Sequence, residues 1–214
     1  MKQLVTHRGG ETLSVILQTL DELGYNTSHR VLNALDYGLP QRRERVFIVG
    51  RRKDCGAFPF AWPEQSVKRR PLNDLLEESV ADRYRASAAI RSARQEKTSH
   101  HVPSDDVPLI FHENKSGHVS AYPYACALRA GSSHNYLLVN GERRLTEREM
   151  LRLQGFPDNF VVTGSYTQTR RQVGNAVPVN LVTAVASALL PYFGQSTPQA
   201  RKNARSQKAK EAAR

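Results

Sequence analysis

The sequence contains few cysteines and no long apolar segment. Its only cysteines, Cys55 and Cys126, stand far apart, which argues against a disulfide framework and against a zinc site. No stretch approaches the roughly 20 consecutive apolar residues that a membrane-spanning helix needs, and the N-terminal MKQLVTHRGGE contains no apolar signal core. We therefore expect an intracellular protein without a bound metal and without a membrane partner.

Acidic residues are also scarce relative to basic ones. Lys and Arg total 31 against 20 for Asp and Glu, which gives a net charge of +11 in 214 residues. Residues 194–214 carry six basic residues and one acidic residue, and this polar composition predicts a disordered tail. The rest of the chain is still basic, so the charge favours a polyanionic partner such as nucleic acid.

The hydrophobic pattern of the first 50 residues predicts alternating helix and strand. Thr12 is a candidate N-cap for a helix with apolar residues at helical spacing, and Gly24 is suited to ending it. Residues 25–32 and 45–50 have the composition of strands, and RVFIVG predicts a buried one. The chain therefore starts as an α/β domain.

The pattern weakens between Arg51 and about Asn140, where prolines interrupt any long element. Residues 72–78 and 84–95 are candidate helices, and the arginines of the second could form either a solvated face or a DNA contact. Regular structure returns at Thr146, which forms a capping-box pattern with Glu149. Pro178 suits the first turn of a largely apolar helix over residues 179–193, which we expect to be deeply buried.

Three segments together resemble the DNA cytosine-5 methyltransferase family. LNALDYGLPQRRERVFIVG at 32–50 is similar to its eighth motif, RRLTEREMLRLQGFPDNF at 143–160 to its ninth, and RRQVGNAVPVNLVTAVASALL at 170–190 to its tenth. The motifs stand in family order, with a variable stretch between the first two.

The resemblance implies the C-terminal part of a Rossmann-like, S-adenosylmethionine-dependent catalytic domain, formed by residues 1–52 and 141–193. A small, loop-rich target-recognition domain that reads double-stranded DNA would occupy residues 53–140. The basic tail would follow at 194–214.

In this family a cysteine attacks carbon 6 of a flipped-out cytosine, and carbon 5 then accepts the methyl group. By its place in the motif, Arg45 would stabilise the charge that develops on the ring oxygen. Arg43 and Gln41 would brace the pocket, with Arg43 holding neighbouring loops rather than touching the ring. Considered alone, QRRER would favour a solvated strand edge.

The tenth motif implies the cofactor contacts. Asn175, with Gly174, Ala176 and Val177, would line the S-adenosylmethionine pocket, where an amide side chain and backbone amides can meet a polar ligand. Asn175 could also act as a helix cap, and the two roles are compatible.

The end of the recognition segment departs from the family pattern. Family members carry a Thr-Leu pair near the DNA backbone, and the matching place here is Ala127-Leu128, followed by Arg129. The missing hydroxyl removes one expected contact. Leu128 and Arg129 remain the candidate DNA-binding residues, and the base sequence that is read does not follow from the motifs.

The family's glycine-rich cofactor loop, Pro-Cys nucleophile and Glu-Asn-Val triplet do not occur in this sequence, and residues 1–25 resemble the segment that follows that triplet. Cys55 and Cys126 lack the Pro-Cys context and are interpreted as structural.

We therefore expect the chain alone to be inactive and to need an N-terminal methyltransferase subunit that supplies the cysteine. Alternatives are a non-enzymatic DNA-binding module or an inactive gene fragment. The resemblance implies a bacterial or phage protein of the cytoplasm, associated with the nucleoid when bound to DNA.

Overall fold

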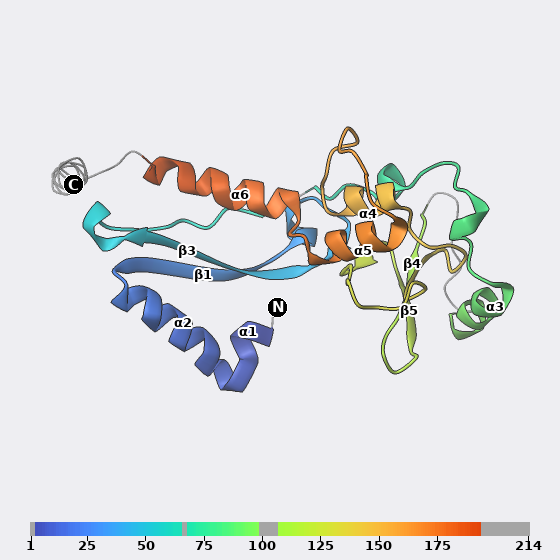
Figure 1. Cartoon of the computed structure of the whole chain (residues 1–214), viewed down its shortest axis with the longest axis horizontal. Coiled ribbons are helices and arrows are strands. Elements are labelled where there is room, and N and C mark those ends of the chain that lie inside the picture. Colours follow the sequence, from blue (N-terminus) through green and yellow to red (C-terminus); the bar gives the residue numbers. More distant parts are fainter. Residues whose placement is uncertain (1–2, 66–67, 99–106, 194–214) are drawn as a thin grey trace, which may run out of the picture. The chain divides into compact units, whose positions relative to one another are not determined.

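The computed structural model describes residues 3–65, 68–98 and 107–193, which form two compact units (Figure 1). The first unit contains residues 3–32, 44–64 and 183–193, and the second contains 33–43, 65, 68–98 and 107–182. Packing thus groups residues 141–182 with most of the expected recognition segment, whereas the motifs assign 141–182 to the catalytic segment. The functional division stays a prediction, and the basic tail lies outside the described residues.

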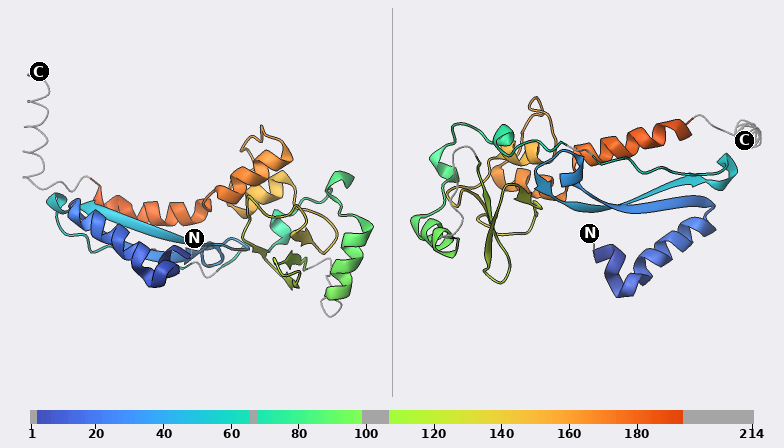
Figure 2. Two further views of the ribbon diagram at one scale, coloured as in Figure 1. Left: turned by 60° about the horizontal axis from the view of Figure 1, so that its bottom comes forward. Right: turned by 180° about the vertical axis from the view of Figure 1, so that it is seen from behind.

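The first unit is built around a two-stranded sheet of β1 (Tyr25–Asn33) and β3 (Glu44–Arg52). It begins with α1 (Gln3–Thr6), η1 (His7–Gly10) and α2 (Glu11–Glu22). η3 (Lys53–Cys55) follows β3, and η6 (Leu190–Tyr192) follows α6 (Val179–Leu189), whose residues from Thr183 onward belong to this unit. Figures 1 and 2 show α2 on one side of the strands and this part of α6 on the other.

Two sequence expectations in this unit need correction. The N-cap of α2 is Gly10, at φ 99°, and Thr12 lies inside the first turn with its hydroxyl 2.6 Å from His7 Nδ1. β3 is a strand as predicted, but Val49 is its only buried residue. Gly24, at φ 84°, follows the helix in the left-handed conformation that glycine adopts without strain.

The second unit contains a three-stranded antiparallel sheet in the order β5-β4-β7, formed by Val119–Tyr122, Ile110–Glu113 and Leu137–Val139. A shorter parallel pair joins β2 (Gln41–Arg42) to β6 (Ala125–Cys126). The helical elements are η2 (Ala34–Tyr37), η4 (Asn73–Leu75), η5 (Asp82–Tyr84), α3 (Ala88–Lys97), α4 (Glu147–Leu153) and α5 (Tyr166–Asn175).

The helices of this unit only partly follow the predictions. The capping box of Thr146 and Glu149 is confirmed, since Glu149 N donates to Thr146 Oγ1 and Thr146 N donates to Glu149 Oε2. The helix predicted over 72–78 is a single 3-10 turn, and that over 84–95 begins only at Ala88. Within α3, Arg94 is buried and paired with Glu113, so this arginine is not part of a solvated face.

The apolar helix α6 is less buried than expected and ends at Leu189. Leu181 and Val185 are buried, whereas Val182 is 46% exposed and Leu190, just beyond the helix, is 64% exposed. Among the described residues, the stretch from Tyr166 to Tyr192 is long and apolar enough to qualify as a membrane span by composition. Ala176 interrupts it in an extended conformation, at ψ 158°, so it contains two short helices rather than one of the roughly 20 residues that a span needs.

Candidate functional site

In the Gln-x-Arg motif at β2, the first and third side chains point into the interior of the second unit. Gln41 and Arg43 are both fully buried, while Arg42 between them is exposed, as the alternation of side chains in a strand requires. The pairing of Gln41 with Ala125 and of Arg42 with Cys126 fixes this register. The motif therefore presents one residue outward and two inward.

Arg43 connects two segments that are distant in the sequence. Its Nη1 donates to Leu128 O at 2.6 Å, and its Nη2 donates to Gly174 O at 2.8 Å and to Ala176 O at 2.6 Å. A guanidinium suits this task because its donors spread in a rigid plane. The structure thus places Arg43 between the loop after β6 and the end of α5, as a group that holds loops.

Two buried glutamines extend the same polar junction. Gln41 Nε2 donates to Leu153 O at 2.7 Å, and Gln41 Oε1 accepts from Leu128 N at 3.4 Å. Gln154, in the ninth motif, donates from Nε2 to Val173 O at 2.9 Å. Each amide satisfies backbone groups at the end of a helix or strand, where the regular pattern of backbone hydrogen bonds stops.

Gly174 allows α5 to approach the loop at 129–130 very closely. A Cβ atom at this position would lie 2.4 Å from Ala130 N and 2.8 Å from Arg129 C. Only glycine leaves room for such contact between two backbones. The Gly174 carbonyl also accepts a hydrogen bond from Arg43. Gly174 therefore has a packing role whether or not a cofactor binds.

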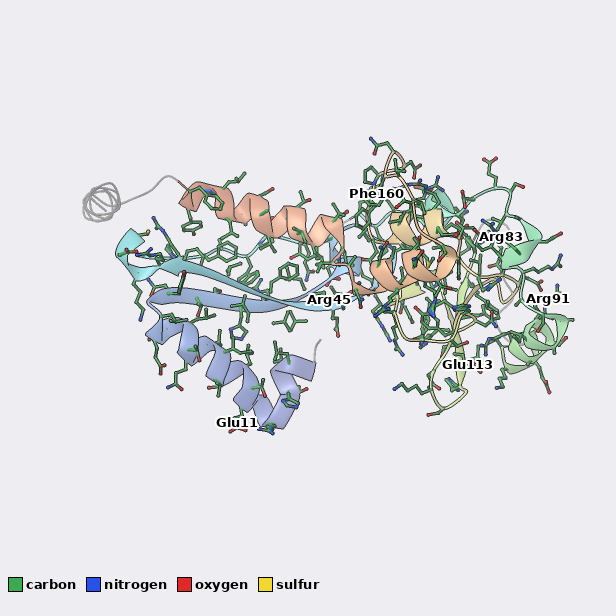
Figure 3. All side chains as sticks on the ribbon, in the orientation of Figure 1. Glu11, Arg45, Arg83, Arg91, Glu113 and Phe160 are labelled. Carbon is green, nitrogen blue, oxygen red and sulfur yellow. The ribbon has the colours of Figure 1, made fainter. Side chains whose placement is uncertain are left out.

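Arg45 is the second residue of β3, in the first unit (Figure 3). Its side chain is half-buried, and burial lowers the pKa of the guanidinium, although an arginine remains protonated at neutral pH. Nη1 donates to the carbonyl of Glu44 at 2.8 Å, while Nε is buried and has no hydrogen-bond partner among the described residues. A partly desolvated cation with an unused donor is suited to receive an anionic oxygen.

The segment expected to contact the cofactor follows α5. Asn175 is the last residue of the helix and is exposed, and its side chain makes no hydrogen bond within the described part of the chain. Ala176 and Val177 are partly buried, and the Ala176 carbonyl accepts from Arg43. The backbone here is therefore fixed, while the amide of Asn175 is available to a ligand.

The two candidate DNA contacts differ in exposure. Leu128 is 3% exposed and packs in the core, so its side chain is not available to DNA in this structure. Arg129 is exposed, while its backbone N donates to Tyr136 Oη at 2.9 Å and its carbonyl accepts from Arg170 Nη1 at 3.3 Å. The backbone of Arg129 is thus fixed, and the DNA contact stays a prediction for this residue alone.

The ninth motif contains a buried ion pair that its local sequence pattern does not predict. Glu149 is fully buried, and its two carboxylate oxygens accept from Arg143 Nη1 and Nη2 at 2.8 and 2.7 Å. Glu77 N also donates to Glu149 at 2.9 Å, which attaches the loop after η4 to α4. The capping box identified Glu149, but a local pattern does not reveal that the same carboxylate also binds an arginine.

Neither cysteine has the surroundings of a nucleophile. Cys126 is buried, and burial raises the pKa of its thiol, which opposes thiolate formation. Cys55 is partly exposed, next to Asp54. Among the described residues, no group of three His, Cys, Asp or Glu side chains gathers in a way that could hold a metal ion.

Solved structures of similar architecture identify the fold of this protein. A putative DNA modification methyltransferase from an Escherichia coli prophage matches 86% of this chain and 67% of its own at 18% identity, with a TM-score of 0.56. A DNMT2 variant from Spodoptera frugiperda matches 83% of this chain and 62% of its own at 16% identity, with a TM-score of 0.60. The fold is thus that of the α/β methyltransferases.

Sequence comparison gives the family. Residues 1–190 match the model of the C-5 cytosine-specific DNA methylases. The chain is 47% identical over 196 residues to the Type II methyltransferase M.NgoBI of Neisseria gonorrhoeae, and 44% identical over 199 residues to M.HaeII of Haemophilus aegyptius. These alignments cover 89% and 92% of this chain, and the chain spans about three fifths of both relatives, 60% and 61%. The protein belongs to the C-5 cytosine-specific DNA methylase family, as its three motifs predicted.

Proposed function

We propose that this chain forms the C-terminal part of a DNA cytosine-5 methyltransferase, which transfers a methyl group from S-adenosylmethionine to carbon 5 of a cytosine flipped out of double-stranded DNA. The family match over residues 1–190 supports the reaction class. The observation that carries the proposal is Arg45, a half-buried guanidinium with an unused Nε donor at the motif position expected to face the base.

Arg45 stabilises the reacting ring. When a cysteine thiolate adds to carbon 6, electron density moves onto the ring and its carbonyl oxygen, and the charged Arg45 donates to that oxygen. A preorganised donor of this kind contributes about a hundredfold to a thousandfold in kcat. Arg45 gives up no proton, because its pKa stays far above neutrality even when burial lowers it.

The end of α5 fits a polar cofactor. Bound S-adenosylmethionine supplies an electrophilic methyl group on its sulfonium sulfur. Asn175 contacts it through its exposed amide, and Val177 offers a partly buried apolar surface two residues later. Arg43 holds the carbonyls of Gly174 and Ala176, and these two residues position the segment instead of presenting their own carbonyls to the ligand.

The nucleophile comes from a polypeptide segment that carries the Pro-Cys, Glu-Asn-Val and glycine-rich motifs, since neither cysteine in residues 1–214 follows a proline. The assembled enzyme acts on DNA in the cytoplasm, at the nucleoid. Co-expression of this chain with such a polypeptide, followed by transfer of labelled methyl groups to duplex DNA, tests the proposal. We expect 5-methylcytosine in the DNA only when both parts are present. A stable assembly that produces none would refute the proposal.

A DNA-binding module without catalysis is the second candidate, favoured by the net charge of +11 and by the lack of a Pro-Cys pair in the printed sequence. It predicts that the isolated chain binds duplex DNA in a salt-dependent manner and that no co-expressed polypeptide confers methyl transfer. The enzyme proposal predicts the same binding but the opposite result for methylation. The co-expression experiment therefore separates the two candidates.

A further inference from the structure

Four side chains of the second unit form a continuous series of ring and guanidinium contacts. The Arg42 guanidinium carbon lies 5.8 Å from the centre of the Tyr122 ring, and that of Arg69 lies 5.9 Å from the centre of the Tyr124 ring. The two tyrosine rings stack on each other at 5.1 Å, with 16° between their planes. We call these four residues the arginine–tyrosine series.

The geometry of the series follows from its local sequence. Arg42 points outward because Gln41 and Arg43 on either side of it are buried. The tyrosines flank Pro123, whose ring fixes its own φ and limits how the two can move relative to each other. An arginine over an aromatic ring keeps its flat face on the ring and its N–H edge free for another ligand.

The two arginines lack acidic partners. In the same unit Arg94, Arg143 and Arg152 each pair with a carboxylate. Among the described residues, by contrast, no carboxylate lies within ion-pair distance of Arg42 or Arg69, and both are exposed. Arg69 makes one long hydrogen bond, from Nε to Leu35 O at 3.5 Å. Their charges are thus held in place without being neutralised.

A third exposed arginine, Arg129, follows three residues after Cys126, which pairs with Arg42. Both Arg42 and Arg129 act on the same imidazole, since burial, then Arg129, Arg42 and Arg94, lower the pKa of His112. Both also act on the Cys126 thiol, whose pKa they lower against the larger effect of burial. Arg129 is exposed and forms no ion pair within the described residues. The arginine–tyrosine series thus forms a basic surface next to the β2–β6 pair, with Arg129 just beyond the end of β6.

We propose that this surface binds the phosphodiester backbone of duplex DNA. Arg42 and Arg69 each contact a phosphate, and the two tyrosines hold the guanidinium groups in position. This inference rests on the proposed function, which makes DNA the substrate; it adds Arg42 and Arg69 to the DNA contacts and makes Tyr122 and Tyr124 their positioning residues.

Phosphate fits the surface better than a stacked base. The two tyrosine rings already contact each other and the two guanidinium groups, which leaves less ring surface for a nucleobase. The free N–H edges of the arginines match the oxygens of a phosphate in number and spacing. Contacts of this kind fix the protein on the duplex without reading its sequence.

DNA binding by the full chain, measured against salt concentration, tests the proposal. The logarithm of the binding constant falls as the logarithm of the salt concentration rises, and each phosphate contact steepens this slope by about 0.9. Arg42→Gln and Arg69→Gln should each make the slope shallower by about that amount and weaken binding roughly fivefold to tenfold at 0.1 M salt. Arg51→Gln is the matched control, since Arg51 lies 5.9 Å from the Tyr192 ring centre in the other unit. We expect its slope to equal that of the original chain.

The tyrosines require a separate variant. Tyr124→Leu removes a ring but keeps both charges, so it should weaken binding while leaving the slope nearly unchanged. Its melting temperature, and those of the arginine variants, establishes that the fold is retained. Unchanged slopes in Arg42→Gln and Arg69→Gln would overturn the proposal. So would tighter binding to single-stranded than to duplex DNA that Tyr124→Leu abolishes, because that result indicates base stacking.

The same variants in the co-expressed assembly separate this inference from the proposed function. Arg42→Gln should raise the KM for DNA and leave kcat at saturating DNA unchanged. If the original assembly methylates DNA and Arg42→Gln has the same KM, only the inference about the surface fails. If no assembly methylates DNA, the proposed function fails, while the salt slopes still decide whether this surface contacts phosphate.

Discussion

Arg43 Nη2 donates to the carbonyl oxygen of Gly174 at 2.8 Å, although the two residues are 131 positions apart. This bond connects the eighth motif to the tenth inside one compact unit, and the Leu128 carbonyl, bound by the same guanidinium, adds the end of the recognition segment. The motifs that resemble those of the family are therefore also joined by hydrogen bonds in the structure. The motif residues meet in a buried polar junction that positions the segments on either side of it.

Gly174→Ala tests the close approach at this junction. The new Cβ would lie 2.4 Å from Ala130 N, so either α5 or the loop must move. We expect a loss of about 1–3 kcal/mol in the free energy of unfolding, the usual cost of overpacking, measured by urea denaturation. Gly131→Ala is the control, since a Cβ there meets nothing within 4 Å. Equal stability of the two variants would contradict the packing role of Gly174.

Glu149→Gln tests the buried ion pair. It leaves the Arg143 guanidinium facing a neutral amide in a site where Glu149 is 0% exposed, and we expect a loss of about 3 kcal/mol or more. Asp158→Asn is the matched surface variant, because the Asp158 side chain is 64% exposed in its pair with Arg152. Its effect should be much smaller, because water screens an exposed ion pair. Chemical denaturation of both variants compares the two costs, and a smaller loss for Glu149→Gln than for Asp158→Asn would be inconsistent with the structure.

The stability of the protein should fall in mild acid because of His112. Burial and the nearby Arg129, Arg42 and Arg94 lower the pKa of His112 in the folded state, so the unfolded chain binds the proton more readily. Stability is then retained above the unfolded value of about 6.5 and lost as the pH falls below it. His112→Gln should reduce this loss at pH values below about 6.5, measured as urea midpoints. An identical pH profile for the variant would exclude His112 as the cause.

A second acidic transition should follow at lower pH. The hydrogen bond from Arg94 lowers the pKa of Glu113 in the folded state. Its contribution to stability is lost only as the pH falls below the ordinary glutamate value of about 4.3. The loss assigned to His112 therefore occurs at a higher pH and can be measured separately.

The sequence correctly predicted those structural features that depend only on neighbouring residues, such as helix caps and strands. The capping box of Thr146 and Glu149 and the strands β1 and β3 were found because caps and hydrophobic period act over a few positions. The same kind of local signal exists for α5, since Ser165 and Gln168 form a second capping box. The extra length predicted for α6 failed because its apolar pattern continues past Leu189, where the helix ends.

Long-range contacts could not be predicted from local patterns. The fixed place of Arg43 depends on carbonyls at Leu128, Gly174 and Ala176, and no residue near Arg43 in the sequence specifies them. Leu128 was selected as a DNA contact by alignment with a motif, whereas its burial depends on how β6 and α4 pack together. The resemblance to a family supplied the roles of these residues, and the structure supplied their contacts.

Methyl transfer by Arg45 variants of the co-expressed enzyme tests the central claim most directly. Arg45→Gln removes the charge and Arg45→Lys keeps it without the planar fork, and both should lower kcat about a hundredfold or more while leaving DNA binding nearly unchanged. Arg52→Gln is the control on the same strand, where Arg52 is exposed and paired with Asp54. Normal kcat in both Arg45 variants would contradict the assignment of Arg45 to the reacting cytosine.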